Sequence, residues 1–149
     1  MKSDEIKLFC DVVVNYFNTV TSDSVEIGVP YVKVDDFETL SITGAIGISG
    51  SRKGCLFVTC SEEMIRDLAR IVLMTDDIDD MTLYDMVGEF TNTIAGNSRQ
   101  AFGPEFDISI PIIVKGTHTE IILQRLKNPV YIVPIKWRRH DFYLNLGID

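Results

Sequence analysis

The feature that most constrains the fold of this 149-residue chain is an internal repeat. Three patterns occur in each half in the same order: a polar triplet spaced at i, i+4 and i+7, an alternating strand that ends in proline, and a hairpin. The matching segments are residues 11–18 and 85–92, residues 25–30 and 106–111, and residues 54–60 and 142–148. The offset grows from 74 (11 to 85) through 81 (25 to 106) to 88 (54 to 142). Offsets that grow while the order stays fixed indicate a duplicated unit with insertions.

Hydrophobic periodicity predicts the secondary structure of both halves. Apolar residues three and four apart predict helices, and alternating apolar residues predict strands. The predicted helices span residues 3–20, 61–74 and 82–102, the first two with Ser3 and Ser61 as N-caps; single strands span 25–30 and 106–111; hairpins span 42–60 and 130–148, with turns at 50–53 and 138–141. Residues 117–128 have no counterpart in the first half, and we expect them to form an added strand or a loop over the sheet edge.

These elements predict one α+β domain over residues 1–149. Its two pseudo-repeats of helix-strand-strand-strand, about residues 3–60 and 82–148, would form one largely antiparallel sheet of about six strands with helices packed on it. The helix over residues 61–74 would link the two halves. With 46% apolar and 24% charged residues, the chain has the composition of a globular protein with a hydrophobic core.

The helix predicted over residues 82–102 has a polar stripe along one face. At about 100° per residue, four residues fall within an arc of about 60°. They are Asp85, Glu89, Asn92 and Gly96. The apolar arc that would face the core holds Leu83, Met86, Val87, Phe90, Ile94 and Ala101. Asn97 points into this arc, so we expect its side chain to be hydrogen-bonded within the fold. A carboxylate and a carboxamide one turn apart on a rigid helix can bind a cation and orient a water molecule.

The same residues also have possible structural roles. Thr82 and Asp85 have the spacing of a capping box, in which Thr82 would be the N-cap and Asp85 the returning acid. Glu89 and Asn92 would then be solvated residues of an amphipathic helix. Gly96 would be a mid-helix glycine that lowers stability by about 1 kcal/mol.

Charge and composition argue against several classes of protein. A net charge of −8 argues against a nucleic-acid partner, which requires clustered lysine and arginine. The apolar runs are too short to cross a bilayer, and the N-terminus lacks a basic and apolar signal sequence. We therefore expect a cytoplasmic protein that does not contact a membrane.

Metal and disulfide sites are not expected. The chain has an odd number of cysteines and no C-x-x-C pair, so we expect reduced and mostly packed thiols. They are Cys10, Cys55 and Cys60. The acidic run over residues 76–80 is interpreted as a solvated loop that supplies helix N-caps, rather than as a metal-diphosphate site. His118 and His140 lie outside any ligand spacing, and we expect each on the surface or in a strand.

Residues 88–97, with the sequence GEFTNTIAGN, resemble the signature helix of the CheC/CheX/FliY phosphatases of bacterial chemotaxis, and of CheX in particular. The family pattern is D/S-x3-E-x2-N, and Asp85, Glu89 and Asn92 match its three positions. The resemblance implies a phosphatase that hydrolyses the aspartyl phosphate of a CheY-like response regulator, in chemotaxis or related two-component signalling. It also implies a pseudo-twofold fold.

The resemblance suggests a role for each residue of the stripe. Asn92 would orient the attacking water through its carboxamide, and Glu89 would pair with the active-site lysine of the regulator. Asp85 and Gly96 would contact the same partner, because a glycine in the stripe permits close approach. The chain would need no cofactor or metal of its own, and Mg²⁺ would be bound by the regulator. The first-half triplet has Asn15 in place of the glutamate, so we expect it to be inactive.

Two other classes of function compete with the enzyme. The same family includes flagellar switch proteins that bind the regulator or each other without catalysis. A small-molecule sensor would instead bind a ligand between the sheet and the helices, although no sequence motif indicates one. The intact pair of Glu89 and Asn92 favours the phosphatase over both alternatives.

The resemblance also implies assembly, because CheX proteins are homodimers joined through their sheets. An uncovered sheet edge without charge or proline favours pairing with a second copy. The strands over residues 55–59 and 142–148 contain no proline and are the candidate edges. We therefore expect a homodimer in which the faces that carry Glu89 and Asn92 stay accessible. The alternative is a monomer whose edges are guarded by the charges of Arg52, Lys53 and Asp141.

Overall fold

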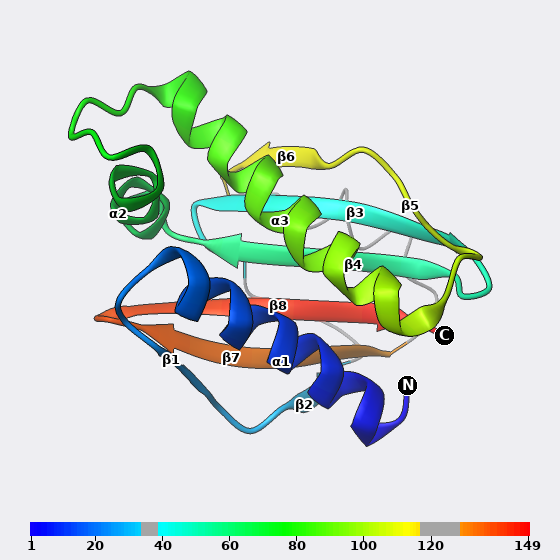
Figure 1. The fold of residues 1–149 in the computed structure, drawn as a ribbon. Helices are drawn as coiled ribbons and strands as arrows, with labels where there is room; N and C mark the ends of the chain where they lie inside the picture. The colour runs from blue at the N-terminus through cyan, green and yellow to red at the C-terminus, as the bar shows by residue number, and fades with distance from the viewer. Residues whose placement is uncertain (34–38, 117–128) are drawn as a thin grey trace.

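The computed structural model describes residues 1–33, 39–116 and 129–149. These residues form three α-helices and eight β-strands (Figure 1). In chain order they are α1 (Ser3–Val20), β1 (Val25–Ile27), β2 (Tyr31–Lys33), β3 (Ile42–Gly50), β4 (Gly54–Cys60), α2 (Glu62–Leu73), α3 (Asp80–Phe102), β5 (Phe106–Ile108), β6 (Ile112–Lys115), β7 (Val130–Trp137) and β8 (His140–Ile148). The predicted α+β class is confirmed. The element expected over residues 117–128, with His118, lies outside the described residues.

The described sheet has eight strands rather than the predicted six, because an unpredicted short strand follows each of the two predicted strands that end in proline. The strand expected over residues 25–30 ends at Ile27, and the chain resumes as β2 directly after Pro30. In the same way, β5 ends at Ile108 and β6 begins directly after Pro111. Proline has no backbone N–H and therefore interrupts the ladder of hydrogen bonds.

The strand order is symmetric between the two halves of the chain. All pairs are antiparallel, in the order β1-β7-β8-β4-β3-β5, with β2 also on β7 and β6 also on β3. The order is unchanged when β1 is exchanged with β5, β2 with β6, β3 with β7 and β4 with β8. This symmetry supports the proposal that residues 3–60 and 82–148 are repeats of one unit, with α2 between them.

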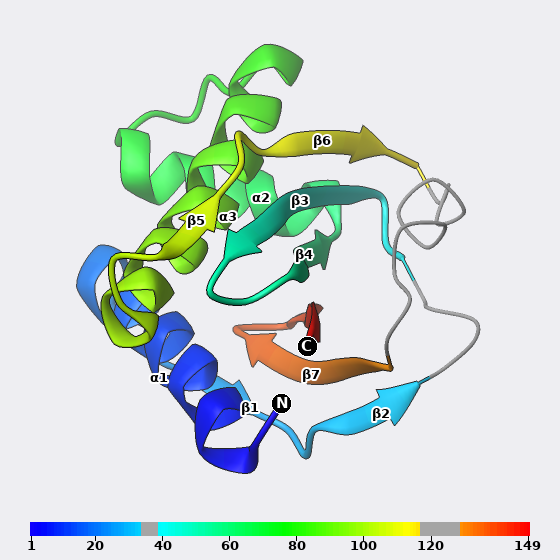
Figure 2. The ribbon, with the colours of Figure 1, turned by 90° about the vertical axis from the view of Figure 1, so that its right-hand side faces the viewer.

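The edges of the sheet are not the strands that the sequence suggested. β4 and β8 pair with each other at the centre of the sheet, so the prediction that they form exposed edges is wrong. Among the described strands, β1 and β2 form one edge, and β5 and β6 form the other. The sheet curves, and β2 and β6 bend away from the helices (Figure 2).

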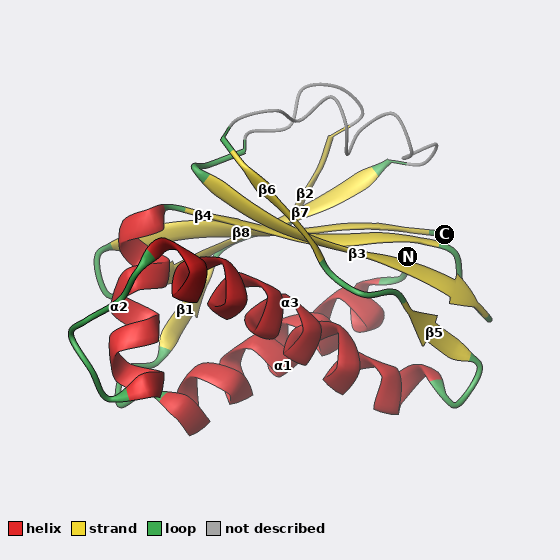
Figure 3. Cartoon of the chain, turned by 90° about the horizontal axis from the view of Figure 1, so that it is seen from above, coloured by secondary structure: helices red, strands yellow, loops and turns green. Residues whose placement is uncertain are grey.

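α1 and α3 lie side by side on one face of the sheet (Figure 3). Buried aromatic rings join the two helices to each other and to the strands. Phe17 of α1 packs on Phe90 of α3 with ring centroids 5.7 Å apart. Phe17 also contacts Trp137 and Phe142 of the sheet, at 5.2 and 5.7 Å. Within the described ranges, no helix is long and apolar enough to cross a membrane.

α3 lies very close to the sheet at Gly44 of β3. A Cβ atom on Gly44 would lie 2.2 Å from Thr91 Oγ1 and 3.1 Å from Val87 Cγ1. Thr91 is buried, and its hydroxyl donates to the Val87 carbonyl at 2.7 Å. A side chain at position 44 would therefore push away the part of α3 that carries Glu89 and Asn92.

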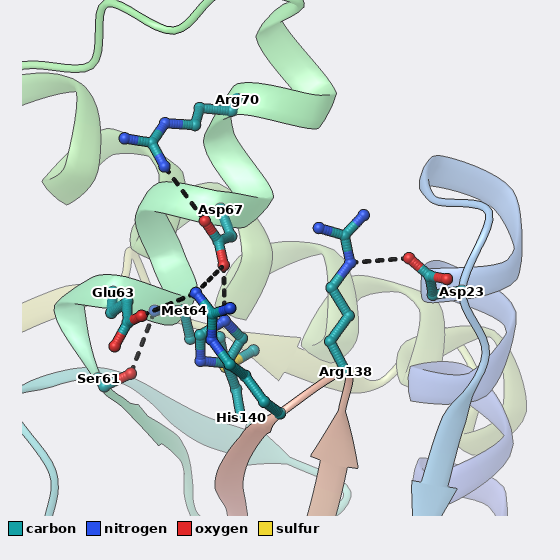
Figure 4. A network of polar contacts seen from close by, with 9 residues as sticks. Asp23, Ser61, Glu63, Met64, Asp67, Arg70, Arg138 and His140 are labelled. Carbon is teal, nitrogen blue, oxygen red and sulfur yellow. Dashed lines mark hydrogen bonds and ion pairs between the residues drawn. The ribbon is translucent and has the colours of Figure 1, made fainter.

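α2 is joined to the β7–β8 hairpin by a network of polar contacts (Figure 4). His140 is buried, and its Nε2 lies 2.7 Å from Asp67 Oδ2. Asp67 Oδ1 accepts from Arg70 at 3.2 Å.

The predicted four-residue turn between β7 and β8 is shorter in the structure, because β8 begins at His140 and only Arg138 and Arg139 separate the two strands. Arg138 takes the left-handed conformation, with φ of 55°.

The predicted N-cap is confirmed for α2 and wrong for α1. Ser61 caps α2, because its Oγ accepts from the Met64 N–H at 3.1 Å. The prediction for α1 is wrong by one residue, since the helix begins at Ser3 and Lys2 occupies the N-cap position. The Lys2 N–H donates to the Glu5 carboxylate at 3.0 Å, so an acid in the first turn satisfies the backbone in place of a serine cap.

Candidate functional site

The helix that carries the candidate site begins in the acidic loop. α3 starts at Asp80, two residues before the predicted start at 82, and its N-cap is Asp79. The Asp79 carboxylate accepts from the Thr82 N–H at 2.8 Å and from the Thr82 hydroxyl at 2.6 Å. The acidic run therefore supplies a cap, as predicted. Thr82 is not the N-cap, so Asp85 has no capping-box role.

The polar stripe forms the outward face of α3. Asp85, Glu89 and Asn92 are exposed, and Gly96 is partly exposed with no atom within 4 Å of the position of its missing Cβ. The opposite arc is buried at the predicted positions Leu83, Met86, Val87, Phe90 and Ile94. The helix therefore presents an acid, an acid and an amide to the same side.

The predicted burial of Asn97 and Ala101 is wrong, because both side chains are exposed. The buried positions in this part of α3 are Ile94, Ala95 and Ser98. On a helical wheel with about 100° per residue, the positions of these three residues differ from that of Asn97 by about 60° or more. The face of α3 that contacts the sheet thus rotates along the helix. Its C-terminal turns bury a different side from the one predicted by the periodicity of the whole segment.

Glu89 and Asn92 line an open groove of about 430 Å³. Gly88 also lines it from α3, and residues 108–111, which connect β5 to β6, form the opposite wall. A Cβ on Gly88 would lie 3.6 Å from Ile113 Cδ1 and 3.8 Å from Pro111 Cγ. The wall therefore packs directly on α3 beside the glutamate.

Hydrogen bonds to β3 hold the wall in place. The Ser109 Oγ accepts from the Gly47 N–H at 2.8 Å, and the Ser109 N–H donates to the Gly47 carbonyl at 2.9 Å. The Ser109 hydroxyl also donates to the Ile110 carbonyl at 3.1 Å. The groove thus lies between two backbone segments that are both fixed to the same strand.

Tyr16 of α1 borders the site on its other side. Its ring packs on Phe90 of α3 with centroids 5.0 Å apart. Burial, and to a lesser degree the negative charge of Glu89, raise the pKa of Tyr16 to about 12. At neutral pH a protonated tyrosine hydroxyl therefore lies near Glu89.

The groove is lined by polar side chains that can bind and orient a partner or a water molecule. Among the described residues, no cluster of three or more His, Cys, Asp or Glu side chains is placed to hold a metal ion. Cys10 and Cys60 are free thiols, and both are buried. What the site offers is a carboxylate that can pair with a cation and a carboxamide that can both donate to and accept from a water molecule.

The first-half triplet lies on the exposed face of α1. Asp11, Asn15 and Asn18 are all solvent-exposed, so the structure gives both helices a polar stripe at the same spacing. They differ in charge, since Asn15 stands at the position that corresponds to Glu89. The α1 stripe therefore has an amide, and not a carboxylate, one turn before Asn18.

Three features of the site were not predicted from the sequence. Tyr16, Ser109 and Ile110 come from segments that are distant from residues 85–96 in the chain. Only the order of the strands and the pairing of α1 with α3 bring them next to Glu89. The available signal was the strand repeat at residues 106–111, which indicated a strand but not its place beside the helix.

Comparisons with known proteins identify a family model and solved structures that are similar to this chain. The family model described as "Chemotaxis phosphatase CheX" matches residues 42–136. The chemotaxis protein CheX from Desulfovibrio desulfuricans is 26% identical, with a TM-score of 0.81 and coverage of 98% of both chains. No match was found among curated proteins.

Two further structures share the fold at lower identity. CheX from Vibrio vulnificus is 22% identical, with a TM-score of 0.85 and coverage of 99% of this chain and 100% of that chain. The CheX-CheY-BeF3-Mg²⁺ complex from Borrelia burgdorferi is 23% identical over 99% of each chain, with a TM-score of 0.76. Each alignment spans nearly the whole of both chains, so the likeness extends to every described element.

Proposed function

This chain belongs to the CheX family, and we propose that it hydrolyses the aspartyl phosphate of a CheY-like response regulator in chemotaxis or related two-component signalling. The observation that carries the proposal is the pair of Glu89 and Asn92. Both are exposed, one turn apart, on a helix that is packed into the core on its other side. Their spacing is therefore fixed before any partner binds.

The proposed reaction is an in-line attack of water on phosphorus. The Asn92 carboxamide oxygen accepts a hydrogen bond from the water. This hydrogen bond directs the water oxygen at the phosphorus, on the side opposite the bond to the aspartyl oxygen. The new P–O bond forms as that bond breaks, which leaves inorganic phosphate and a free aspartate on the regulator. Positioning and electrostatic support supply most of the rate in such transfers, so the site needs no nucleophile of its own.

The remaining residues of the stripe are proposed to bind the regulator. Glu89 pairs with a lysine of the regulator's active site and fixes the orientation of Asn92 towards the phosphoryl group. Asp85 adds negative charge one turn earlier, and Gly96 lets the regulator approach the helix backbone. The Borrelia complex contains CheY with BeF3 and Mg²⁺. We propose by analogy that Mg²⁺ stays with the regulator here and neutralises charge on the phosphoryl oxygens.

We also propose that the protein works in the cytoplasm. Cys10 and Cys60 are buried free thiols, which fits a reducing compartment. The CheY-like regulator that the proposal requires would be present in the same compartment.

Release of phosphate from a phosphorylated receiver tests the proposed function. The wild-type protein is expected to accelerate loss of the acyl phosphate. Asn92→Ala is expected to fold normally and to lose at least about 100-fold in rate, because the water is no longer oriented. Glu89→Ala is expected to raise KM as well as lower kcat, since it removes a contact with the regulator.

Asn18→Ala is the matched control, because Asn18 holds the corresponding place on α1. It is expected to keep wild-type activity, since the α1 stripe lacks the carboxylate. Wild-type turnover by Asn92→Ala would refute the assigned mechanism. Tight binding of the receiver without any release of phosphate would show a non-catalytic interaction module instead.

A further inference from the structure

A second groove continues the polar stripe of α3 beyond Asn92. It has a volume of about 370 Å³ and is lined by residues from the end of the helix and the turn after it, which are Gly96, Arg99, Gln100, Gly103 and Pro104. Among the described residues, no atom lies within 4 Å of the position that a Cβ would take on Gly96 or Gly103. The backbone of α3 is therefore open to close approach by a partner here.

Arg99 places a cation in this second groove. It is the only lysine or arginine of α3, and its side chain is 48% exposed. Because it follows Asn92 by seven residues, the two side chains lie within about 20° of each other around the helix and about 10 Å apart along its axis. A chain with a net charge of −8 thus presents a positive group on the same face as Glu89 and Asn92.

The fold engages the Arg99 side chain only weakly. In the described part of the chain its one polar partner is Asp107 of β5, whose Oδ1 lies 3.9 Å from Nη2. This separation is too long for a hydrogen bond, and an exposed ion pair of this kind contributes little to stability. Asp107 directly precedes Ile108, which lines the first groove, so the ion pair lies between the two grooves. The guanidinium donors are therefore available to a partner that covers both.

A receiver bound at Asn92 would also cover Arg99. This step rests on the proposed function, in which the reacting phosphate belongs to a folded protein that binds Mg²⁺. A specific complex buries roughly 800 Å² on each partner, a patch on the order of 30 Å across. A partner centred on Asn92 therefore extends past a residue that lies about 10 Å further along the helix. Carboxylates are the side chains that hold Mg²⁺ in proteins, so the receiver surface around its phosphoryl group carries negative charge.

We propose that Arg99 binds a carboxylate of the phosphorylated receiver next to its phosphorylation site, and that the second groove is part of the docking surface. A guanidinium presents its N–H donors as a fork that matches the two oxygens of a carboxylate. Glu89 and Arg99 then bind groups of opposite charge on the receiver, on either side of Asn92, and this fixes the orientation of the receiver. Arg99 acts in binding and Asn92 acts in the reaction, so the two roles can be separated by experiment.

The test measures binding and turnover separately. Binding kinetics are measured by surface plasmon resonance with a CheY-like receiver loaded with Mg²⁺ and beryllium fluoride, a stable mimic of the phosphorylated form. Arg99→Ala is expected to weaken binding by about 10-fold, chiefly through slower association. It is also expected to raise KM for phosphate release by a similar factor, with kcat within about twofold. Arg99→Lys, which keeps the charge but not the fork, should lose less.

Two further variants and the salt dependence separate a docking contact from a structural role. Asp107→Asn removes the competing carboxylate and is expected to tighten binding by about two- to threefold. Arg139→Ala is the matched control, because Arg139 is also in an exposed ion pair, with Glu63 at 3.0 Å. It lies in the β7–β8 turn, at the opposite end of the molecule from the end of α3 (Figure 1), and its loss should leave binding unchanged. The defect of Arg99→Ala should shrink between about 0.05 and 0.5 M salt, which screens exposed charges.

Unchanged binding by Arg99→Ala, an equal loss in Arg139→Ala, or a loss that does not vary with salt would overturn the docking role while leaving the proposed reaction intact. A fall in kcat with unchanged binding would assign Arg99 to the reaction, which also overturns the docking role. Conversely, salt-dependent weakening in Arg99→Ala of binding to a receiver that the wild type does not dephosphorylate would support the docking role and refute the reaction. Thermal unfolding of each variant checks that the fold is unchanged.

Discussion

Glu89 and Asn92 are positioned by the backbone of α3 rather than by contacts of their own side chains. In the part of the chain that the structure describes, no hydrogen bond or ion pair engages either side chain, and the Glu89 carbonyl accepts from Thr93 Oγ1 at 2.8 Å. Exposed side chains without partners contribute little to stability. Substitution of either residue is therefore expected to change activity without changing the fold.

Asp67 shows the opposite behaviour, because its partners couple stability to pH. Burial alone would raise the pKa of this carboxyl, but the hydrogen bond to His140, together with the nearby charges, holds the pKa below its ordinary value. A lowered folded-state pKa contributes stability above the unfolded value of about 3.9, and this contribution is lost as the pH falls through the folded value. The contact therefore stabilises the fold at neutral pH and weakens in acid.

Asp67→Asn is expected to lower the free energy of unfolding by about 1 kcal/mol at pH 7. The difference from the wild type should shrink as the pH falls below about 4, because the carboxyl of the unfolded chain then takes up a proton, and it should vanish below the lower folded-state pKa. Urea denaturation between pH 7 and 3 measures it. Asp76→Asn, at an exposed loop position, is the control and should show no such trend. A difference that stays constant over this range would contradict the assigned coupling.

At the scale of elements, the sequence predicted what depends on local periodicity and missed what depends on the order of strands. β7 was predicted with its observed bounds, and α3 was predicted to within two residues at its start. The spacing of Glu89 and Asn92 could also be predicted, because helix geometry alone sets it. The groove wall could not, because residues 108–111 reach α3 only through the pairing of β5 and β6 with β3.

The wrong edge prediction has a related cause. β4 contains Leu56, Phe57 and Val58 in succession, and all three are buried. A strand with buried residues on both faces lies inside a sheet, whereas the absence of proline only permits an edge. The run of consecutive apolar residues was therefore the better signal, and it indicated a central strand.

The close packing of α3 on β3 predicts opposite effects for two glycines. Gly44→Ala is expected to destabilise the fold by about 1 to 3 kcal/mol, because the new Cβ overlaps Thr91 Oγ1. Gly96→Ala, the control, is expected to stabilise it by up to about 1 kcal/mol, since alanine favours a helix and nothing lies within 4 Å. Denaturant titration measures both. Equal stability of Gly44→Ala and the wild type would show that α3 can move outward at no cost.

At the scale of the whole molecule, the strand order is symmetric but the two edges of the sheet have different surroundings. The β5–β6 edge lies beside Glu89 and Asn92, the residues proposed for the regulator. The β1–β2 edge lies in the half whose stripe has Asn15 in place of the glutamate, and it exposes Val29, Tyr31 and Val32. We propose that the two edges have separate partners, the regulator at the first and a second copy of the chain at the second.

Pairing of two β2 strands about a twofold axis would bury these apolar residues in both chains and leave both catalytic faces outside. Light scattering at micromolar concentration is therefore expected to give twice the mass of the 16.8 kDa chain. Val32→Lys places a charge at the proposed seam and should produce a monomer that still releases phosphate at the wild-type rate per chain. Ile112→Lys, at the other edge, should remain a dimer. A wild-type mass near that of one chain would exclude the dimer, and a monomeric Ile112→Lys would move the seam to the β5–β6 edge.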